Sequence, residues 1–480
     1  MELLDFSLCE IVEKLRAGEV TSVELVEACF ARIRETADLN ALNSVYYEES
    51  IARARSIDER RQKGEDVGRL GGVPLVIKDN INLVGTRTTC ASKFLENFES
   101  PYTATCAQKL YDAGAIIIAK ANMDEFAMGS SNENSAFGAV KNPVDPTRVP
   151  GGSSGGSACT VASRQCFGSL GTDTGGSIRE PSSFCGVVGL KPTYGRVSRY
   201  GVVAFASSLD QVGPITRTVR DNALLAEIIS GKDEMDMTSA DLEVESFDEA
   251  LSKGVKGLKI GIAEQFFTSK LNSEVRAAIQ GCIDALVSRG AETVAVTLPS
   301  LDASLATYYI LSSAEAASNL ARFDGVKYGV RAENYSDVVD LYFQSRTQGF
   351  GAEVKRRIML GNYVLSSGYF DAFYRKAKRV QKVIRREFCD VFEQCDVLIC
   401  PTTATTAFKL GEKSNDPVAM YLTDIFTVPI NIAGVPALSM PCGVSSEGLP
   451  IGVQIIAKHF DEANIYRAAA AIEQVQKEAK

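Results

Sequence analysis

The chain has 480 residues, of which 45% are hydrophobic and 23% are charged, and this composition is typical of a soluble globular protein with a large core. A net charge of -9 at pH 7 argues against a protein that binds nucleic acid over a wide surface of its own. No apolar run approaches the roughly 20 residues of a membrane span, and the N-terminus lacks the basic segment of a signal peptide, so we expect a cytoplasmic protein.

The 12 cysteines are scattered singly, mostly within apolar runs, and no C-x-x-C pair occurs. Zinc sites and disulfide frameworks normally show paired or regularly spaced cysteines. We therefore expect buried, reduced thiols and no metal site in this chain. Cys185 lies close to the glycine loops described below, but its apolar neighbours indicate a packing role.

The N-terminal segment has the capping signals of helices. Thr21 followed three residues later by Glu24 is a capping box, and glycines at positions 18 and 64 are natural helix stops. These signals predict helices over residues 7–18, 21–33 and 48–63. We therefore predict a helical N-terminal arm over residues 1–64 that packs on the core, followed by one large catalytic domain over residues 65–480.

A lysine follows the next apolar run. Val73–Ile77 has the composition of a buried strand, and Lys78 ends it. An isolated lysine in such a place most often points to water. After a turn-rich segment, Ser100 and Pro101 provide a helix cap and a first-position proline for a helix ending at Gly114, and a strand is predicted over 115–119. This alternation is that of a βαβ unit.

Two similar glycine-serine clusters stand in the stretch from Gly151 to Pro181. The first is Gly152–Gly155 and the second is Gly175–Ser177. Glycine allows main-chain N–H groups to approach a ligand without a Cβ in the way. The apolar run Cys166–Leu170 predicts a short buried strand before the second cluster, which places Ser177 near the end of a strand, where α/β sheets hold their sites.

A serine nucleophile needs a base to take its proton. The chain has one histidine, His459, close to the C-terminus, and a Ser-His-Asp arrangement would have to use it, although nothing around it resembles a site. A lysine whose burial favours the neutral amine is the better hypothesis, and Lys78 is the candidate. Asp124 and Glu125 are adjacent acids that could form a carboxylate pair for acid-base chemistry. Because adjacent residues on a helix point in different directions, we interpret both as structural.

The rest of the chain continues to alternate. Strands are predicted over 258–262, 293–296, 397–400, 437–440 and 453–456. Helices are predicted over 272–288, in most of 303–392 and over 462–476. We therefore predict an α/β fold with a single large mixed β-sheet covered by helices on both faces.

The stretch from Gly151 to Pro181 resembles the amidase-signature family, whose pattern is Gly-Gly-Ser-Ser-Gly-Gly, a spacer, and Asp-x-Gly-Gly-Ser-x-Arg-x-Pro. The second half is matched from Asp173 to Pro181, and the family's lysine context is matched by Ile77–Asn80. The resemblance implies the family's α/β fold and a Ser-Ser-Lys triad. In that triad Ser177 is the nucleophile, Ser153, held by a cis peptide, is the bridging serine, and Lys78 is the base.

The same resemblance supplies the rest of the reaction centre. Amide attack develops an oxyanion, and the N–H groups of Thr174, Gly175, Gly176 and Ser177 are the natural donors for it. Two further segments, 350–361 and 420–426, resemble the A subunits of tRNA-dependent amidotransferases.

By that likeness Arg357 binds the α-carboxylate of glutamine and Asp424 its α-ammonium, with Tyr308 nearby. A free amino acid requires one cation and one anion in this way. The basic run before Arg357 leaves open whether Arg356 or Arg357 carries the contact. Without the likeness, Arg357 would be interpreted as part of a solvated helix face and Asp424 as a helix cap.

The predicted function is therefore that of a glutaminase subunit which supplies ammonia for conversion of Glu-tRNA(Gln) to Gln-tRNA(Gln). The chain has no P-loop, so ATP is expected to bind elsewhere. The likeness implies a heterotrimer with B-type and C-type subunits, with ATP and Mg on a partner and tRNA mainly on the B-type partner. Asp-tRNA(Asn) stays open as a further substrate. The alternatives are a stand-alone amidase for small amides and a non-enzymatic protein whose loops bind an anion.

Overall fold

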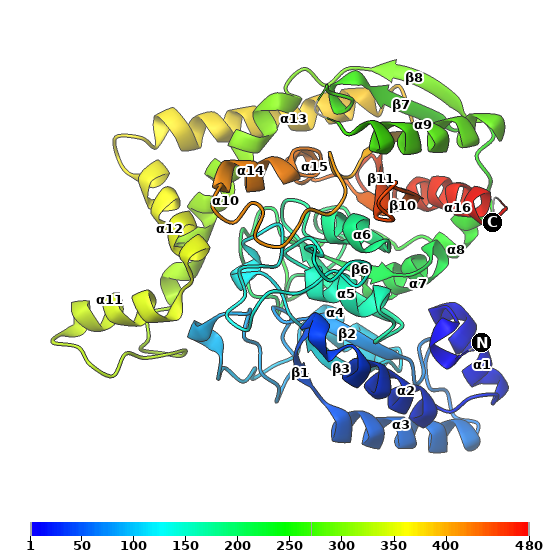
Figure 1. Ribbon diagram of the computed structural model, residues 1–480, viewed down its shortest axis with the longest axis horizontal. Helices are drawn as coiled ribbons and strands as arrows, with labels where there is room; N and C mark the ends of the chain where they lie inside the picture. Colours follow the sequence, from blue (N-terminus) through cyan, green and yellow to red (C-terminus); the bar gives the residue numbers. More distant parts are fainter. Residues whose placement is uncertain (1, 270, 479–480) are drawn as a thin grey trace.

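One mixed sheet of eleven strands runs through the described part of this computed structural model, residues 2–269 and 271–478 (Figure 1). The strands are β1 (Leu42–Val45), β2 (Pro74–Lys78), β3 (Ile116–Ala121), β4 (Gly168–Asp173), β5 (Val188–Lys191), β6 (Gln211–Thr216), β7 (Lys259–Ala263), β8 (Glu292–Val296), β9 (Val397–Pro401), β10 (Ala437–Val444) and β11 (Pro450–Ala457). Their order in the sheet is β1-β3-β2-β4-β6-β5-β10-β11-β9-β7-β8.

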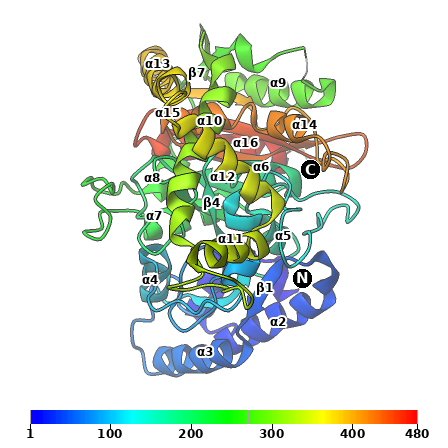
Figure 2. The same cartoon turned by 90° about the vertical axis from the view of Figure 1, so that its left-hand side faces the viewer.

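Helices cover both faces of this sheet (Figures 1 and 2). They are α1 (Leu8–Ala17), α2 (Ser22–Glu35), α3 (Tyr47–Gln62), α4 (Thr105–Asp112), α5 (Gly155–Ala162), α6 (Arg179–Cys185), α7 (Val219–Ile229), α8 (Phe247–Leu251), α9 (Ser273–Ser288), α10 (Ser304–Asn319), α11 (Val338–Gly349), α12 (Ala352–Leu365), α13 (Lys376–Val391), α14 (Pro417–Tyr421), α15 (Val428–Ala433) and α16 (Glu462–Glu478). The predicted fold class, a large mixed sheet between helices, is confirmed.

Local signals placed the N-terminal helices well. The capping box of Thr21 and Glu24 forms at the start of α2, and Gly18 ends α1 in the left-handed region. The predicted helix start at Ser100 and Pro101 is wrong, because the Ser100 hydroxyl donates to the carbonyl of Tyr102 and closes a turn. The helix itself, α4, begins at Thr105.

Strands β5 and β6 were not predicted. The β6 sequence contains Gly213 and Pro214, and both residue types are depleted in strands because neither supports a regular ladder. The strand nevertheless forms, since it lies fully buried between β4 and β5. Tertiary pairing overrides the local preference here.

The sheet places the ends of β2 and β4, which lead to the predicted site residues, at one edge. Strands β2 and β4 are parallel neighbours, with Ile77 paired to Leu170. Because parallel strands end at the same edge, Lys78 at the end of β2 and the loop that follows Asp173 at the end of β4 come together. The loop then leads directly into α6.

The first three helices pack on the sheet close to the same strands. Helix α2 contacts β2 and α3 contacts β3. Their apolar residues share one hydrophobic cluster with those strands. The division of the chain into an arm over residues 1–64 and a catalytic domain stays a prediction.

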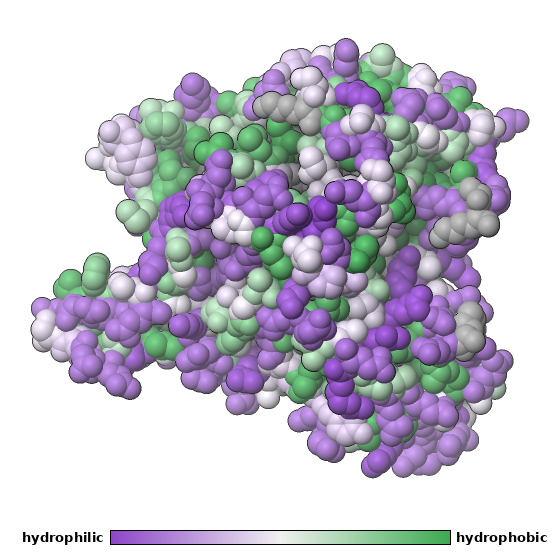
Figure 3. All heavy atoms as spheres, in the orientation of Figure 1, coloured by the Kyte–Doolittle hydropathy of each residue, from purple (hydrophilic) through white to green (hydrophobic). Residues whose placement is uncertain are grey.

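Helices α10, α11 and α12 form a projection on one side of the molecule, and α11 is its tip (Figures 1 and 2). Polar and apolar residues are interspersed over the face seen in Figure 3, and apolar side chains including Val338 and Phe343 are exposed on α11.

Within the described residues, no helix combines the length and apolar character that crossing a membrane would require. Among the described residues, the cysteines are free thiols, and all but Cys9, Cys389 and Cys442 are buried.

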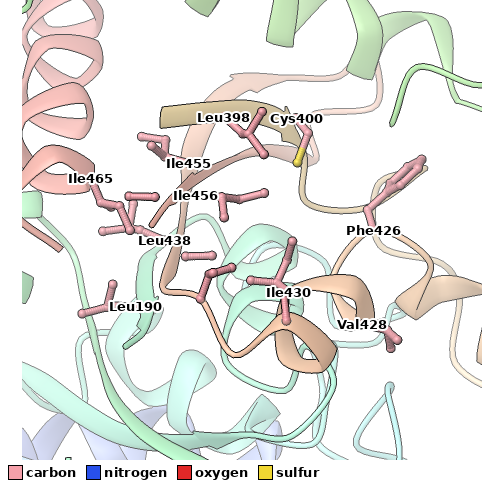
Figure 4. Close-up of a cluster of buried hydrophobic side chains, with 14 of the residues drawn as sticks. Leu190, Leu398, Cys400, Phe426, Val428, Ile430, Leu438, Ile455, Ile456 and Ile465 are labelled. Carbon is pink, nitrogen blue, oxygen red and sulfur yellow. The ribbon is translucent and has the colours of Figure 1, made fainter. Parts of the chain in front are cut away.

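The largest hydrophobic cluster lies around the centre of the sheet, where β10 and β11 pack against α15 and α16 (Figure 4). Leu438 is completely buried there and is paired with Leu190 of β5 and Ile455 of β11. The same strand ends at Val444, which is 68% exposed.

We expect Leu438→Ala to lower the free energy of unfolding by about 2–5 kcal/mol, because the lost side chain leaves a cavity in a packed core. Denaturant unfolding of the purified protein measures this. Val444→Ala, at the exposed end of the same strand, is the matched control and should stay within about 0.5 kcal/mol of the wild type. Equal losses for the two variants would contradict the assignment of the core to this strand centre.

Candidate active site

Lys78 is fully buried at the end of β2 and is surrounded by hydroxyl groups. Its Nζ lies 2.7 Å from Ser153 Oγ, 2.8 Å from Ser154 Oγ and 2.9 Å from Thr172 Oγ1. Burial lowers the pKa of Lys78 to about 7, although the negative charges of Asp124 and Asp173 oppose that shift. A sizeable fraction of the amine is therefore neutral near pH 7.

The two glycine-serine loops meet beside this lysine. The peptide bond between Gly152 and Ser153 is cis. The backbone N–H of Ser154 donates to the carbonyl of Ser177 at 3.1 Å, which joins the two loops directly. Ser153 is fully buried, whereas Ser177 keeps 7% of its surface exposed and its hydroxyl makes no hydrogen bond within residues 2–269 and 271–478. The fold thus gathers Lys78, Ser153 and Ser177, with the Ser177 oxygen uncommitted.

A buried ion pair closes the loop that carries Ser177. Asp173 Oδ1 lies 3.0 Å from Arg179 Nη2, and Asp173 Oδ2 lies 3.0 Å from Arg179 Nε, so the pair is bidentate. The backbone N–H groups of Gly176 and Ile178 also donate to the Asp173 carboxylate, at 2.9 and 3.1 Å. Burial raises the pKa of Asp173, but the charge and hydrogen bond of Arg179, together with Lys191 and the Asn431 side chain, outweigh burial and lower that pKa to about 2.

The glycines of this loop are required by close neighbours. A Cβ on Gly175 would lie 2.6 Å from the hydroxyl of Tyr308, and Gly176 has a φ of +141°. The Gly176 N–H is engaged by Asp173, so it is not available to an oxyanion in this arrangement. The backbone N–H groups of Thr174, Gly175 and Ser177 donate no hydrogen bond within the described residues.

Asp424 lies in a buried polar cluster close to the same loop. Tyr309 of α10 donates its hydroxyl to Asp424 Oδ2 at 3.0 Å, and Ser130 donates to the same oxygen at 2.9 Å. Burial raises the pKa of Asp424 to about 6, partly opposed by these hydrogen bonds. The Thr427 hydroxyl contacts the carbonyls of both Asp424 and Gly175, at 3.1 and 2.7 Å, and so connects this acid to the serine loop.

Arg357 of α12 is buried and only partly satisfied. Its Nε donates to Glu353 Oε1 at 2.6 Å, while its Nη1 is buried without a hydrogen-bond partner in the described part of the chain. The guanidinium lies over the ring of Tyr309, 4.6 Å from the centroid. Arg356 has 48% of its side chain exposed, against 3% for Arg357. Of the two arginines left open by the sequence, Arg357 is therefore the buried one.

Tyr308 connects these groups to the serine loop. Its ring packs edge to face against Tyr309 with centroids 5.0 Å apart, and its hydroxyl faces Gly175. Burial raises the pKa of Tyr308, so the phenol stays neutral. The structure thus brings all three predicted substrate-binding residues, Tyr308, Arg357 and Asp424, to one side of the Ser177 loop.

Several neighbours of these groups were missed by sequence reasoning. The sequence assigns no individual role to Tyr309, Ser130 or Tyr421, although the segments 122–130 and 420–426 resemble the family, and their contacts depend on segments far apart in the chain. Glu353 had a usable signal, because an acid four residues before Arg357 on a helix is placed to pair with it.

The structure also gives the contacts of Asp124, Glu125 and His459. Asp124 accepts backbone N–H groups of Asn132 and Asn134, and Glu125 accepts the backbone N–H of Gly351, contacts that favour a structural role for both acids. The His459 ring contacts the carbonyl of Ala433 at 3.1 Å and makes no hydrogen bond to a site serine within the described residues.

Comparison with known proteins identifies the family of this chain. The family described as Amidase matches residues 24–466. The chain is 54% identical over 475 residues to the A subunit of glutamyl-tRNA(Gln) amidotransferase from Geobacillus thermodenitrificans, covering 99% of this chain and 98% of that protein. The A subunit from Oceanobacillus iheyensis is 53% identical over 476 residues, covering 99% and 97%. The crystal structure of the Thermotoga maritima A subunit has a TM-score of 0.82 at 42% identity, covering 99% of this chain and 95% of the other.

Removal of the buried charge at Asp173 tests how far the loop depends on it. We expect Asp173→Asn to destabilise the protein by about 3–5 kcal/mol, because Arg179 is left as a buried and unpaired cation. Denaturant unfolding followed by circular dichroism measures this.

The matched control is Asp371→Asn, which breaks a 3.1 Å pair with Arg375 on the surface. Exposed pairs contribute little, so this variant should unfold with the wild type. Coincident unfolding curves for Asp173→Asn and Asp371→Asn would show that the buried pair does not hold the loop.

Proposed function

The chain belongs to the amidase family and, within it, to the glutamyl-tRNA(Gln) amidotransferase A subunits, and on that premise we propose that it hydrolyses glutamine to supply ammonia for tRNA-dependent amidation. The observation that carries the proposal is the pairing of two sites. A buried lysine is hydrogen-bonded to Ser153 beside the Ser177 loop, and a buried acid and a buried cation are connected to the same loop through Thr427 and the Tyr308–Tyr309 pair.

The proposed chemistry begins with neutral Lys78, which accepts a proton from Ser153 as Ser153 accepts one from Ser177. The Ser177 oxygen bonds to the side-chain carbonyl carbon of glutamine. As the C–N bond breaks, the relay returns a proton to the leaving nitrogen, and ammonia departs. Water then attacks the ester, which releases glutamate and restores the Ser177 hydroxyl.

Stabilisation of the oxyanion is assigned to main-chain donors of the Ser177 loop. Among the predicted donors, the N–H groups of Thr174, Gly175 and Ser177 are uncommitted in the described residues, whereas Gly176 serves Asp173. Donors fixed in advance by the surrounding loop stabilise developing charge without reorganisation at the moment of reaction. We therefore assign the oxyanion hole to Thr174, Gly175 and Ser177, with Gly176 holding the loop in shape.

Recognition of glutamine follows from the two buried charges. The unpartnered Nη1 of Arg357 supports a contact to the α-carboxylate, and Asp424 supports one to the α-ammonium. Tyr308 forms the wall between them and Gly175. A small aliphatic or aryl amide offers no charged group to the unpartnered Nη1 of Arg357 or to the Asp424 carboxylate, so the buried polar groups of this site disfavour it relative to glutamine.

The relatives' name also supports a place in a larger assembly. We propose that two further subunits, of B and C type, complete a cytoplasmic heterotrimer, that ATP and Mg bind to a partner, and that the B-type partner holds most of the tRNA. The net charge of -9 agrees with a chain that leaves the nucleic acid to another protein of the assembly.

The direct test is release of ammonia from glutamine by the purified chain, alone and then with its partner subunits, ATP and Glu-tRNA(Gln). We expect slow release alone, strong stimulation by the complete system, and no release from Ser177→Ala. Hydrolysis of varied amides at full rate without a partner would instead identify a stand-alone amidase. Binding of glutamine with no turnover under any condition would identify a non-enzymatic protein.

The role of Lys78 predicts a pH profile. Because the neutral amine is the base and its pKa is about 7, glutaminase kcat should rise with pH up to about 7 and then level off. Lys78→Arg should lose about 100-fold or more of kcat at every pH, since a guanidinium does not lose its proton in this range. Steady-state assays from about pH 5.5 to about 9 measure both effects.

The control for this substitution is Lys93→Arg, an exposed lysine outside the Lys78 cluster, which should keep the wild-type profile. A flat wild-type profile through pH 7, or an active Lys78→Arg enzyme, would exclude Lys78 as the base.

A further inference from the structure

A buried acid without a donor lies behind the proposed ammonium site. Glu180, the second residue of α6, is completely buried, and both of its carboxyl oxygens lack a hydrogen-bond partner among the described residues when the group is ionised. It occupies the variable position between Arg179 and Pro181 in the signature. A buried carboxylate with no donor is strongly disfavoured, so this group must have another state.

The group that faces Glu180 is another acid. Its carboxyl forms a hydrogen bond with Asp424 once one of the two carries a proton. The other charged groups that act on Glu180 are Lys413 and Asp124. Lys413 lies over the ring of Phe408, 4.0 Å from its centroid, and forms no ion pair with Glu180 in the described part of the chain. Among the described residues, no cation forms an ion pair with Glu180, so the proton shared with Asp424 is the way its charge is avoided.

We propose that Glu180 is a positioning residue which, as the neutral acid, donates its O–H to Asp424 and holds that carboxylate ionised and aimed at the substrate ammonium. The inference rests on the proposed function, because it takes Asp424 as the ammonium ligand. It deepens that function by giving the ammonium site a second acid that the signature itself does not specify.

The charge balance favours this arrangement. Two carboxylates buried side by side do not both ionise, and one shared proton leaves a single negative charge, which matches the single positive charge of an ammonium. Burial and the charge of Asp424 raise the pKa of Glu180 well above its ordinary value, and the donated hydrogen bond lowers the pKa of Asp424. With Tyr309 and Ser130, Glu180 is the third donor to this carboxylate.

The test measures glutamine affinity by calorimetry in the assembled complex, with Ser177→Ala as the common background so that no hydrolysis occurs. Two substitutions of similar length separate the roles of Glu180. Glu180→Gln keeps a donor to Asp424, and Glu180→Met removes it. Asp424→Asn removes the anion itself, and Glu412→Gln, an exposed acid next to Lys413, is the matched control. Titrations run from about pH 5 to about pH 8.

The sign of the pH effect is decisive. Affinity should fall as the pH drops through the pKa of Asp424, since the anion is then lost. Glu180→Gln should stay within about twofold of the background in affinity and keep its acid midpoint, because the donor is retained. Glu180→Met should bind about tenfold more weakly, with the midpoint moved to higher pH, because a carboxylate that loses a donor has a higher pKa.

Other outcomes overturn the proposal. If both Glu180 variants move the midpoint to lower pH, Glu180 is an ionised neighbour whose charge had raised the pKa of Asp424. If neither variant changes affinity or midpoint, Glu180 does not act on Asp424. In both cases loss of binding in Asp424→Asn would leave the proposed function standing. Failure of the Ser177→Ala complex itself to bind glutamine would overturn the proposed function, and this inference with it.

Discussion

The buried pair of Asp173 and Arg179 is the interaction on which the rest of the site depends. It closes the turn that holds Gly175, Gly176 and Ser177, and the Asp173 carboxylate also receives two backbone N–H groups of that turn. Arg179 also donates to the carbonyl of Thr427, which directly precedes α15. It donates further to the side chains of Asn431 in α15 and Gln454 in β11. The loop that carries Ser177 lies in the first half of the chain and is therefore held in place by residues of the C-terminal part of the chain.

Two buried lysines near neighbouring strand ends have different surroundings. Lys120 of β3 lies 3.6 Å from the carboxylate of Asp79, while Lys78 of β2 meets hydroxyl groups and a carbonyl and no carboxylate among the described residues. An adjacent carboxylate stabilises the ammonium form, whereas hydroxyls accommodate either form. Asp79, the residue next to Lys78 in sequence, thus pairs with the other lysine, which leaves the Lys78 amine to the hydroxyl groups around it.

Sequence reasoning predicted the motifs and strands that are determined by contiguous residues. Lys78 and the stretch from Gly151 to Pro181 carry a long motif, and strands such as β2 and β11 carry apolar runs. The surroundings of the substrate charges are different, because Ser130 and Asp424 are 294 residues apart and meet only in the folded chain. Strand β6 was missed for a related reason, since its Gly213 and Pro214 oppose strand structure locally and its neighbours in the sheet decide the outcome. Glu180 stood inside the motif, but only its burial beside Asp424 reveals its chemistry.

The two ends of the proposed substrate pocket are physically coupled through one side chain. Tyr309 donates its hydroxyl to Asp424, and its ring lies beneath the guanidinium of Arg357. Tyr421 stacks on Tyr309 with ring centroids 4.0 Å apart and donates to Glu353, the acid that orients Arg357. Both charges are thus held by fixed dipoles and rings before any ligand arrives, so little reorganisation is needed on binding. Tyr309 and Tyr421 together set the positions of Arg357 and Asp424. The proposed pocket should therefore select ligands by the distance between their two charged ends as well as by the signs of those charges.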